Sequence, residues 1–110
     1  MVQLPEAQTT AEKWYLVTIY DNDNNPLGKF FWGIVVEDKK RRFQPGHYVC
    51  STMIQEELSD SLFQTANTLY EGIGKGVRTS LHYRHFESLR AGFSPDEIEG
   101  MTAMQGAKPV

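Results

Sequence analysis

The chain is poor in cysteine and has no long apolar run. Its 110 residues contain one cysteine, Cys50, which excludes an intramolecular disulfide and is typical of a reducing compartment. A run of about 18 apolar residues, the length that a membrane-spanning helix needs, is absent from the sequence. Residues 1–10 have neither the positive charge nor the apolar segment of a signal peptide. We therefore expect a cytoplasmic protein with no membrane partner.

Positive charge is the minority charge. The chain has 11 Lys and Arg against 14 Asp and Glu, which gives a net charge of −3. Because nucleic-acid-binding domains are usually basic, this balance argues against nucleic acid as the main partner. Hydrophobic residues make up 40% and charged residues 23%, as in an ordinary globular protein. We expect one domain over residues 1–110, with loose ends at residues 1–10 and 106–110.

Catalytic motifs are also missing. The sequence has no G-x-S-x-G, H-E-x-x-H or kinase-type motif. Cys50 would act as a nucleophile only if the fold brought His47 or His82 beside it. An apolar strand surrounds Cys50 in the sequence, and such surroundings raise the pKa of a thiol and make it inert. We therefore expect a protein that is not an enzyme and that has no cofactor.

The spacing of Asp21, Asp23 and Asn25 resembles the start of a calcium-binding loop. A calcium loop needs glycine at its sixth position, where this chain has Pro26. The bidentate glutamate of the twelfth position is replaced by Trp32. An acidic turn explains these residues without an ion, so we expect no calcium site.

Two further patterns point weakly to zinc or phosphate. His47-x-x-Cys50 and His82-x-x-His85 offer zinc ligands, but residues three apart on a straight strand point to opposite faces, and there is no second cysteine. Residues 72–76, GIGKG, lack the full phosphate-loop motif and precede an alternating, strand-like segment. We expect no metal and read residues 72–76 as a hairpin turn.

The most apolar segment is the run over residues 30–36. It is rich in aromatic and β-branched residues, which favour a strand. Both of its faces are apolar, so we expect a strand covered on both sides or part of a closed barrel. Trp32, Ile34 and Val36 share one face and are expected in the core. Gly33 predicts a bulge or sharp bend.

A hairpin is expected to follow this strand. Residues 37–42, EDKKRR, read as a solvated connection. Residues 44–47, QPGH, have proline and glycine where a type II turn requires them. Residues 47–54 read as the second strand.

Alternation of apolar and polar residues predicts the remaining strands, at residues 13–20, 62–65, 68–71 and 77–83. The first of these pairs with the central strand, and the last two are expected to pair with each other. Residues 55–60 are expected to form a polar loop or a short helical turn.

Two helices are predicted at the C-terminal end. The first covers residues 84–91 and ends at Gly92. The second begins with Ser94, Pro95 and Glu97, a capping box with proline in the first helical position. The fold class is thus α+β: a strongly bent antiparallel sheet of five or six strands, open or barrel-like, with one or two C-terminal helices.

Three segments resemble parts of small proteins found in gammaproteobacteria such as pseudomonads and in their phages and prophages. These segments, within residues 28–98, are WGIVVEDKKRRFQPGHYVCSTMI, LFQTANTLYEGIG and LRAGFSPDEI. The resemblance implies an accessory bacterial or phage protein. It implies no activity and assigns no functional residue.

The candidate partner-binding residues lie around the only concentrated cluster of positive charge. They are the basic run Lys39, Lys40, Arg41 and Arg42, together with Phe43 and Tyr48. Aromatic residues and arginine dominate protein interfaces, which favours a protein-binding accessory module, in one form an inhibitor or immunity protein encoded by a phage or mobile element. The alternatives are a nucleic-acid-associated regulator that uses the basic run and a homo-oligomer, such as a homodimer, that pairs through an exposed edge strand.

Overall fold

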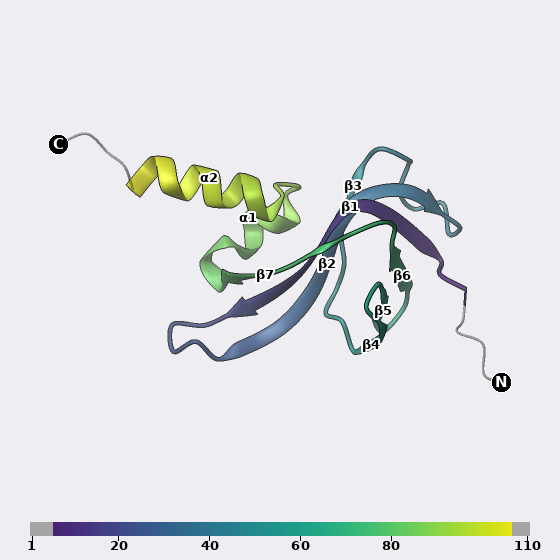
Figure 1. The fold of residues 1–110 in the computed structure, drawn as a ribbon, viewed down its shortest axis with the longest axis horizontal. Coiled ribbons are helices and arrows are strands. Elements are labelled where there is room, and N and C mark those ends of the chain that lie inside the picture. The colour runs from purple at the N-terminus through teal and green to yellow at the C-terminus, as the bar shows by residue number, and fades with distance from the viewer. Residues whose placement is uncertain (1–5, 107–110) are drawn as a thin grey trace.

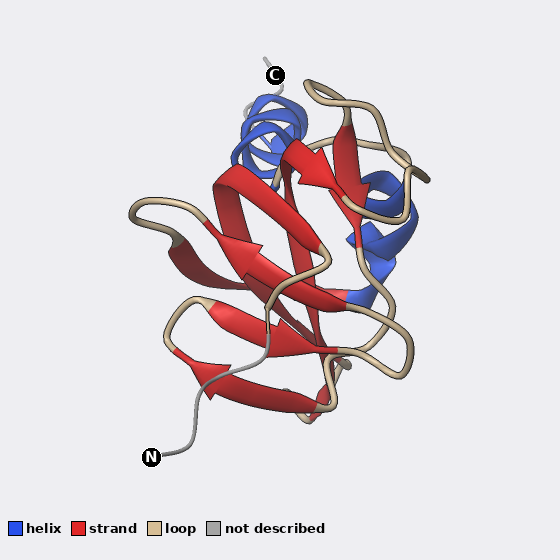
Figure 2. Ribbon diagram, turned by 90° about the vertical axis from the view of Figure 1, so that its right-hand side faces the viewer, coloured by secondary structure: helices blue, strands red, loops and turns tan. Residues whose placement is uncertain are grey.

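A computed structural model describes residues 6–106, which form a seven-stranded sheet followed by helices (Figures 1 and 2). The strands are β1 (Thr9–Tyr20), β2 (Pro26–Asp38), β3 (Tyr48–Cys50), β4 (Glu56–Ser59), β5 (Leu62–Gln64), β6 (Leu69–Gly72) and β7 (Val77–His82). The helical segments are the 3-10 turn η1 (Tyr83–His85), α1 (Phe86–Arg90) and α2 (Pro95–Gly106). The predicted α+β class is therefore confirmed. No helix within residues 6–106 is long and apolar enough to cross a membrane.

The long antiparallel hairpin of β1 and β2 organises the sheet. It pairs Thr9 with Asp38 at one end and Tyr20 with Pro26 at the other. The strand order is β3-β2-β1-β6-β5-β4, and β7 also pairs with β1. The hairpin between β2 and β3 is confirmed as well. The sheet has seven strands rather than five or six, and it is open rather than barrel-like because its end strands β3 and β4 do not pair with each other.

The sheet is mixed, whereas the sequence predicts an antiparallel one. Both β6 and β7 run parallel to β1, beside its first and second halves respectively. Residues 72–76 therefore form a bulge between two collinear strands, and the predicted hairpin turn is wrong. Trp14 explains the bulge: its indole ring packs against Gly72 and Gly76, and its Nε1 donates to the Gly74 carbonyl at 3.2 Å. A side chain at either glycine would collide with the ring.

The two larger of the three apolar clusters among the described residues lie along the bent hairpin. The first comprises Ala11, Trp14, Leu16, Phe31, Val35, Val49, Phe63 and Tyr70. The second comprises Val17, Ile19, Phe30, Trp32, Leu81, Leu89 and Ile98. Gly33 lies opposite the register shift in β1, where a Cβ would come within 2.9 Å of Ala11 Cβ. The irregularity predicted at Gly33, a bulge or a sharp bend, is thus confirmed as a bulge-like register shift, because only glycine permits this approach.

The predicted core face of β2 is only partly correct. Trp32 is buried and Ile34 is half-buried, but Val36 is 40% exposed. Leu89 of α1 and Ile98 of α2 close the second core over Trp32 and Ile34, and Val36 lies outside that cluster. The core residue at this end of β2 is Val35, on the opposite face.

Two predictions for the segment after β2 are wrong. The strand expected over residues 47–54 is limited to β3, and Ser51 ends the ladder because its Oγ accepts the Phe31 N–H at 2.8 Å. Residues 55–60, expected as a loop or helical turn, contain β4, which pairs with β5. β4 is an edge strand with solvated side chains, so its sequence is polar.

The helices follow the predicted signals closely. Gly92 ends α1 with a φ of 112°, a conformation that favours glycine. Ser94 Oγ accepts the Glu97 N–H at 3.2 Å, and Glu97 Oε1 accepts the Ser94 N–H at 3.0 Å. This reciprocal pair confirms the capping box. Figure 1 shows both helices at the end of the molecule opposite β4 and β5.

The prediction of a loose N-terminal end is wrong for residues 6–10, the part that the structure describes. Ala7 and Thr9 are buried, and β1 begins at Thr9. Gln8 N–H donates to the Leu69 carbonyl at 3.0 Å. The predictions for residues 1–5 and 107–110 lie outside the described residues, and Gly106 is the last residue of α2.

Candidate functional site

The basic run is held in place by a buried carboxylate at the end of β2. Asp38 is 7% exposed, and its oxygens accept the backbone N–H groups of Lys40 at 3.2 Å, Arg42 at 2.7 Å and Phe43 at 3.1 Å. The Thr9 hydroxyl donates to the same carboxylate at 3.0 Å. Asp38 therefore determines the path of the turn.

Asp38 remains charged despite its burial. Burial alone would raise the pKa of this carboxyl group, but the hydrogen bonds from Arg42, Thr9, Phe43 and Lys40 favour the ionised form and bring the pKa below its usual value. The prediction that residues 37–42 form a wholly solvated connection is thus wrong at Asp38.

The first two cations of the basic run contact the N-terminal segment and the β5–β6 turn. Lys39 forms an ion pair with Glu6. Lys40 Nζ donates to the Asn67 carbonyl at 2.6 Å and to Thr68 Oγ1 at 3.3 Å. Neither lysine lines a cleft with the predicted aromatic residues.

The two arginines of the basic run behave differently. Arg42 Nε lies 3.5 Å from an Asp38 oxygen, and Arg42 Nη1 donates to Thr68 Oγ1 at 3.1 Å. Arg41 is exposed, has a φ of 57°, and forms no side-chain hydrogen bond or ion pair with the part of the chain that the structure describes. Only Arg42 of the four cations reaches the candidate site described next.

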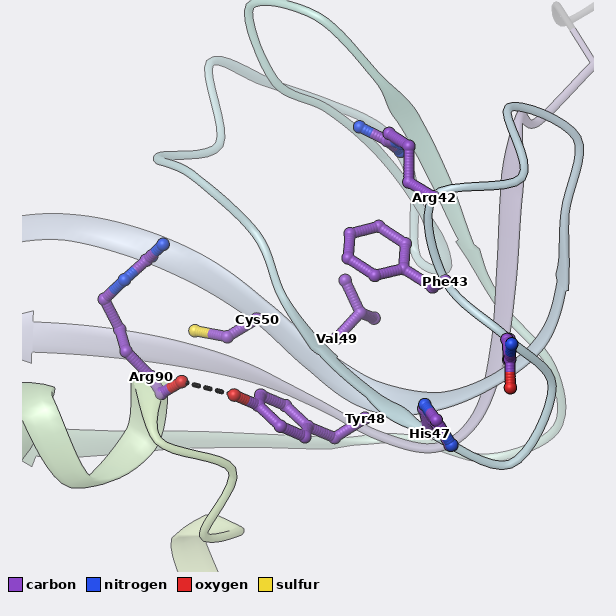
Figure 3. A pocket seen from close by; sticks show the side chains of 8 residues that line it. Arg42, Phe43, His47, Tyr48, Val49, Cys50 and Arg90 are labelled. Carbon is purple, nitrogen blue, oxygen red and sulfur yellow. Dashed lines mark hydrogen bonds between the residues drawn. The ribbon is translucent and has the colours of Figure 1, made fainter.

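An open cleft of about 670 Å³ lies beside β3, and we refer to it as the β3 cleft (Figure 3). Its lining residues come from the β2–β3 connection, from β3 and from the end of α1: Arg42, Phe43, Gln44, His47, Tyr48, Val49, Cys50 and Arg90. Three of the predicted site residues, Arg42, Phe43 and Tyr48, therefore come together. Lys39, Lys40 and Arg41 do not line this cleft.

Arg90 is the charged lining residue that the sequence did not predict. The Tyr48 hydroxyl donates to the Arg90 carbonyl at 2.7 Å, and Arg90 Nη1 donates to the Ser51 carbonyl at 3.2 Å. The Tyr48 ring packs against Gly92, where a Cβ would come within 2.8 Å, and stacks on Trp32 at 6.3 Å. These contacts fix the end of α1 against β3, a long-range arrangement with no local sequence signal.

The lining of the β3 cleft is positively charged although the chain is net negative. It includes Arg42, Arg90 and His47, and it includes no Asp or Glu. Asp38 offsets part of the Arg42 charge. Arg90 pairs with no carboxylate of residues 6–106. The β3 cleft thus suits an anionic ligand.

Cys50 lies in the β3 cleft as a protonated thiol. Burial raises the pKa of its thiol to about 11, and the nearby Arg90 charge lowers it only in part. The raised thiol pKa predicted from the sequence is therefore confirmed. At neutral pH little thiolate is present to act as a nucleophile or metal ligand.

The other candidate ligands have protein partners. His82 Nε2 lies 2.6 Å from Asn22 Oδ1, and the Arg84 Nε group donates to His85 Nε2 at 3.3 Å. The Asp21 carboxylate accepts the backbone N–H groups of Asp23 and Asn25 within its own turn. Within residues 6–106, no three His, Cys, Asp or Glu side chains are grouped so as to hold a metal ion.

The fold and the β3 cleft define a small α+β domain with a mixed, open sheet and a cationic, aromatic cleft at one edge. Residues 7–88 match the family described as Domain of unknown function (DUF6957), and the chain belongs to this family. The matched range contains every lining residue of the β3 cleft except Arg90. No curated protein and no solved structure was found to match the chain.

Proposed function

We propose that the chain is a non-enzymatic, cytoplasmic protein-binding module whose partner occupies the β3 cleft. The observation behind this proposal is the convergence of Phe43, Tyr48, Arg42 and Arg90 on one open cleft. Aromatic and arginine side chains supply most of the binding energy at protein interfaces. Tyr48 and Arg90 are already held by hydrogen bonds, so little side-chain entropy is lost when a partner binds.

As an accessory protein of a bacterium or its phage, the module would act by occluding its partner, as an inhibitor or immunity protein does. The resemblance in residues 28–98 supports this form. The raised pKa of the Cys50 thiol, and the lack of a metal-ligand cluster among residues 6–106, support a role in binding rather than in chemistry.

The nucleic-acid alternative has weaker support. A protein that binds nucleic acid needs cations free to contact successive phosphates. Lys39, Lys40 and Arg42 are instead committed to Glu6, to the β5–β6 turn and to Asp38. Only Arg41 of the basic run makes no such contact within residues 6–106.

Affinity capture with matched variants tests the proposal. The cleft variant is Tyr48→Ser with Arg90→Gln, and the control is Tyr83→Ser with Arg84→Gln, which changes the same residue types at exposed positions outside the β3 cleft. We expect a partner from a lysate of the source cell to be retained by the wild type and the control and lost by the cleft variant. Equal capture by both variants, with folding verified by circular dichroism, would contradict the proposal.

A further inference from the structure

The cleft lies beside an unpaired strand edge. β3 is the end strand of the sheet order and pairs only with β2. An edge strand leaves a row of backbone N–H and C=O groups without partners, and such a row can accept an additional strand from another chain. The side chains around the β3 cleft therefore surround a backbone surface that is itself able to bind.

The hydrogen-bond pattern identifies the free groups. The Val35 N–H donates to the His47 carbonyl and the Ser51 N–H donates to the Phe31 carbonyl, both at 2.8 Å. In an antiparallel pair, residues alternate between hydrogen-bonded and non-hydrogen-bonded positions. Val49, opposite Gly33, therefore faces β2, whereas Tyr48 and Cys50 direct their N–H and C=O groups away from it. No residue within 6–106 bonds to these four outward groups.

Both sides of β3 carry an aromatic ring near this edge. Phe43 packs against the core that contains Val49, and Tyr48 packs on the other side with Trp32. Figure 3 shows Phe43 and Tyr48 on opposite sides of the strand, with Arg90 beyond Cys50. A strand added along β3 would place successive side chains against the two rings in turn.

The charge around the edge limits the occupant. His47 precedes β3, Arg90 lies at its far end, and Arg42 lies beside Phe43, with no acidic residue in the lining. A second copy of the chain would bring two such cationic edges together in a symmetric pair, and like charges repel. An acidic segment has the complementary charge.

We propose that an extended, acidic segment of a partner protein adds as a strand to the outer edge of β3. This inference rests on the proposed function and specifies its partner. The segment bonds to the outward N–H and C=O groups of Tyr48 and Cys50. Its carboxylates pair with Arg90, which has no carboxylate partner within residues 6–106, and its apolar side chains pack on Phe43 and Tyr48.

Three fluorescein-labelled peptides test this geometry by anisotropy with the whole chain. The first peptide alternates glutamate and valine, and the second has lysine in place of glutamate. The third is the first peptide with N-methyl groups at consecutive central residues, so that neither edge of the peptide strand has central N–H groups to donate. We expect only the first to bind. We expect Arg90→Gln to weaken the binding of the first peptide about tenfold or more, as for the loss of a charged hydrogen bond. We expect Arg84→Gln to leave this affinity unchanged.

Amide hydrogen exchange locates the bound peptide. With the acidic peptide bound, exchange at Tyr48 and Cys50 is expected to slow, whereas Val49, whose amide already faces β2, serves as the internal control. Equal binding of the N-methylated peptide would overturn strand addition, and equal binding of the lysine peptide would overturn the acidic partner. Both results leave the proposed function in place.

Failure of the acidic peptide to bind would also overturn the inference, because the arginines would then only keep other strands away from the edge. The affinity capture with the cleft variant decides the proposed function separately. If the cleft variant loses the partner but the acidic peptide does not bind, the protein-binding module stands and strand addition is rejected.

Discussion

At the scale of single residues, Asp38 shows how a local charge pattern misleads. In the sequence it is one of six consecutive charged residues. In the structure it is the buried acceptor that shapes the turn, whereas its neighbour Glu37 is exposed. Composition cannot distinguish the two, because the difference arises from contacts with Thr9 of another strand.

Replacing Asp38 should therefore destabilise the fold. We expect Asp38→Ala to lower the free energy of unfolding by about 1–3 kcal/mol, because buried donors lose their acceptor. Glu37→Ala, on the exposed side of the same turn, should change it by less than about 0.5 kcal/mol. Urea denaturation of both variants measures this difference, and equal stability of the two would show that Asp38 does not hold the turn.

Cys50 should make stability depend on alkaline pH. Burial raises the pKa of its thiol from 9.0 to about 11, so the folded state keeps a proton that the unfolded state releases. The stabilisation is complete below pH 9 and is lost as the pH rises to about 11, by roughly 1.4 kcal/mol for each unit of the shift. Urea melts across this range should show the decline, with a smaller one in Cys50→Ala. Identical slopes would contradict the raised pKa.

At the scale of elements, the sequence predicted the turns and helix ends that depend on residues close together in the chain. The β1–β2 and β2–β3 hairpins, the Gly92 stop and the Ser94 capping box all depend on neighbouring residues, and the structure confirms them. The parallel pairing of β7 with β1 depends on residues about 60 positions apart, as the Trp14 to Gly74 hydrogen bond shows. A glycine-rich stretch alone does not show that an indole ring occupies its space.

The Trp14 contact leads to a prediction at this scale. A Cβ at Gly76 would lie 2.2 Å from the Trp14 ring, so we expect Gly76→Ala to cost about 1–3 kcal/mol through overpacking. Gly100 in α2 has no atom within 4 Å of its added Cβ, and Gly100→Ala should stabilise the protein by about 0.5–1 kcal/mol. Thermal melts compare the two variants. A stable Gly76→Ala protein would show that the bulge adapts without cost.

At the scale of the whole molecule, the candidate site combines parts that lie far apart in sequence. Phe43 and Tyr48 were predictable as site residues because they lie near the basic run. Arg90 was not, since only the packing of α1 on β3 brings it to the β3 cleft. The sequence therefore located the β2–β3 half of the cleft, and the fold supplied Arg90, which pairs with no carboxylate of residues 6–106.

The whole-molecule charge separates the protein-binding and nucleic-acid proposals. With a net charge of −3 and most of its basic run bound internally, the wild type should not bind single- or double-stranded oligonucleotides near physiological salt. Changing Lys39, Lys40, Arg41 and Arg42 together to Ser should instead lower stability, because Lys40 and Arg42 connect the turn to Thr68.

Arg41→Ser is the control for this prediction, because Arg41 makes no side-chain hydrogen bond or ion pair within residues 6–106 and its loss should leave stability unchanged. Anisotropy titrations with labelled oligonucleotides and urea melts of all three proteins give the measurement. Tight oligonucleotide binding that falls steeply with salt and disappears in the four-Ser variant would reject the protein-binding module in favour of a nucleic-acid-associated regulator. Its absence, together with a destabilised four-Ser variant, would establish the basic run as a structural turn beside the β3 cleft.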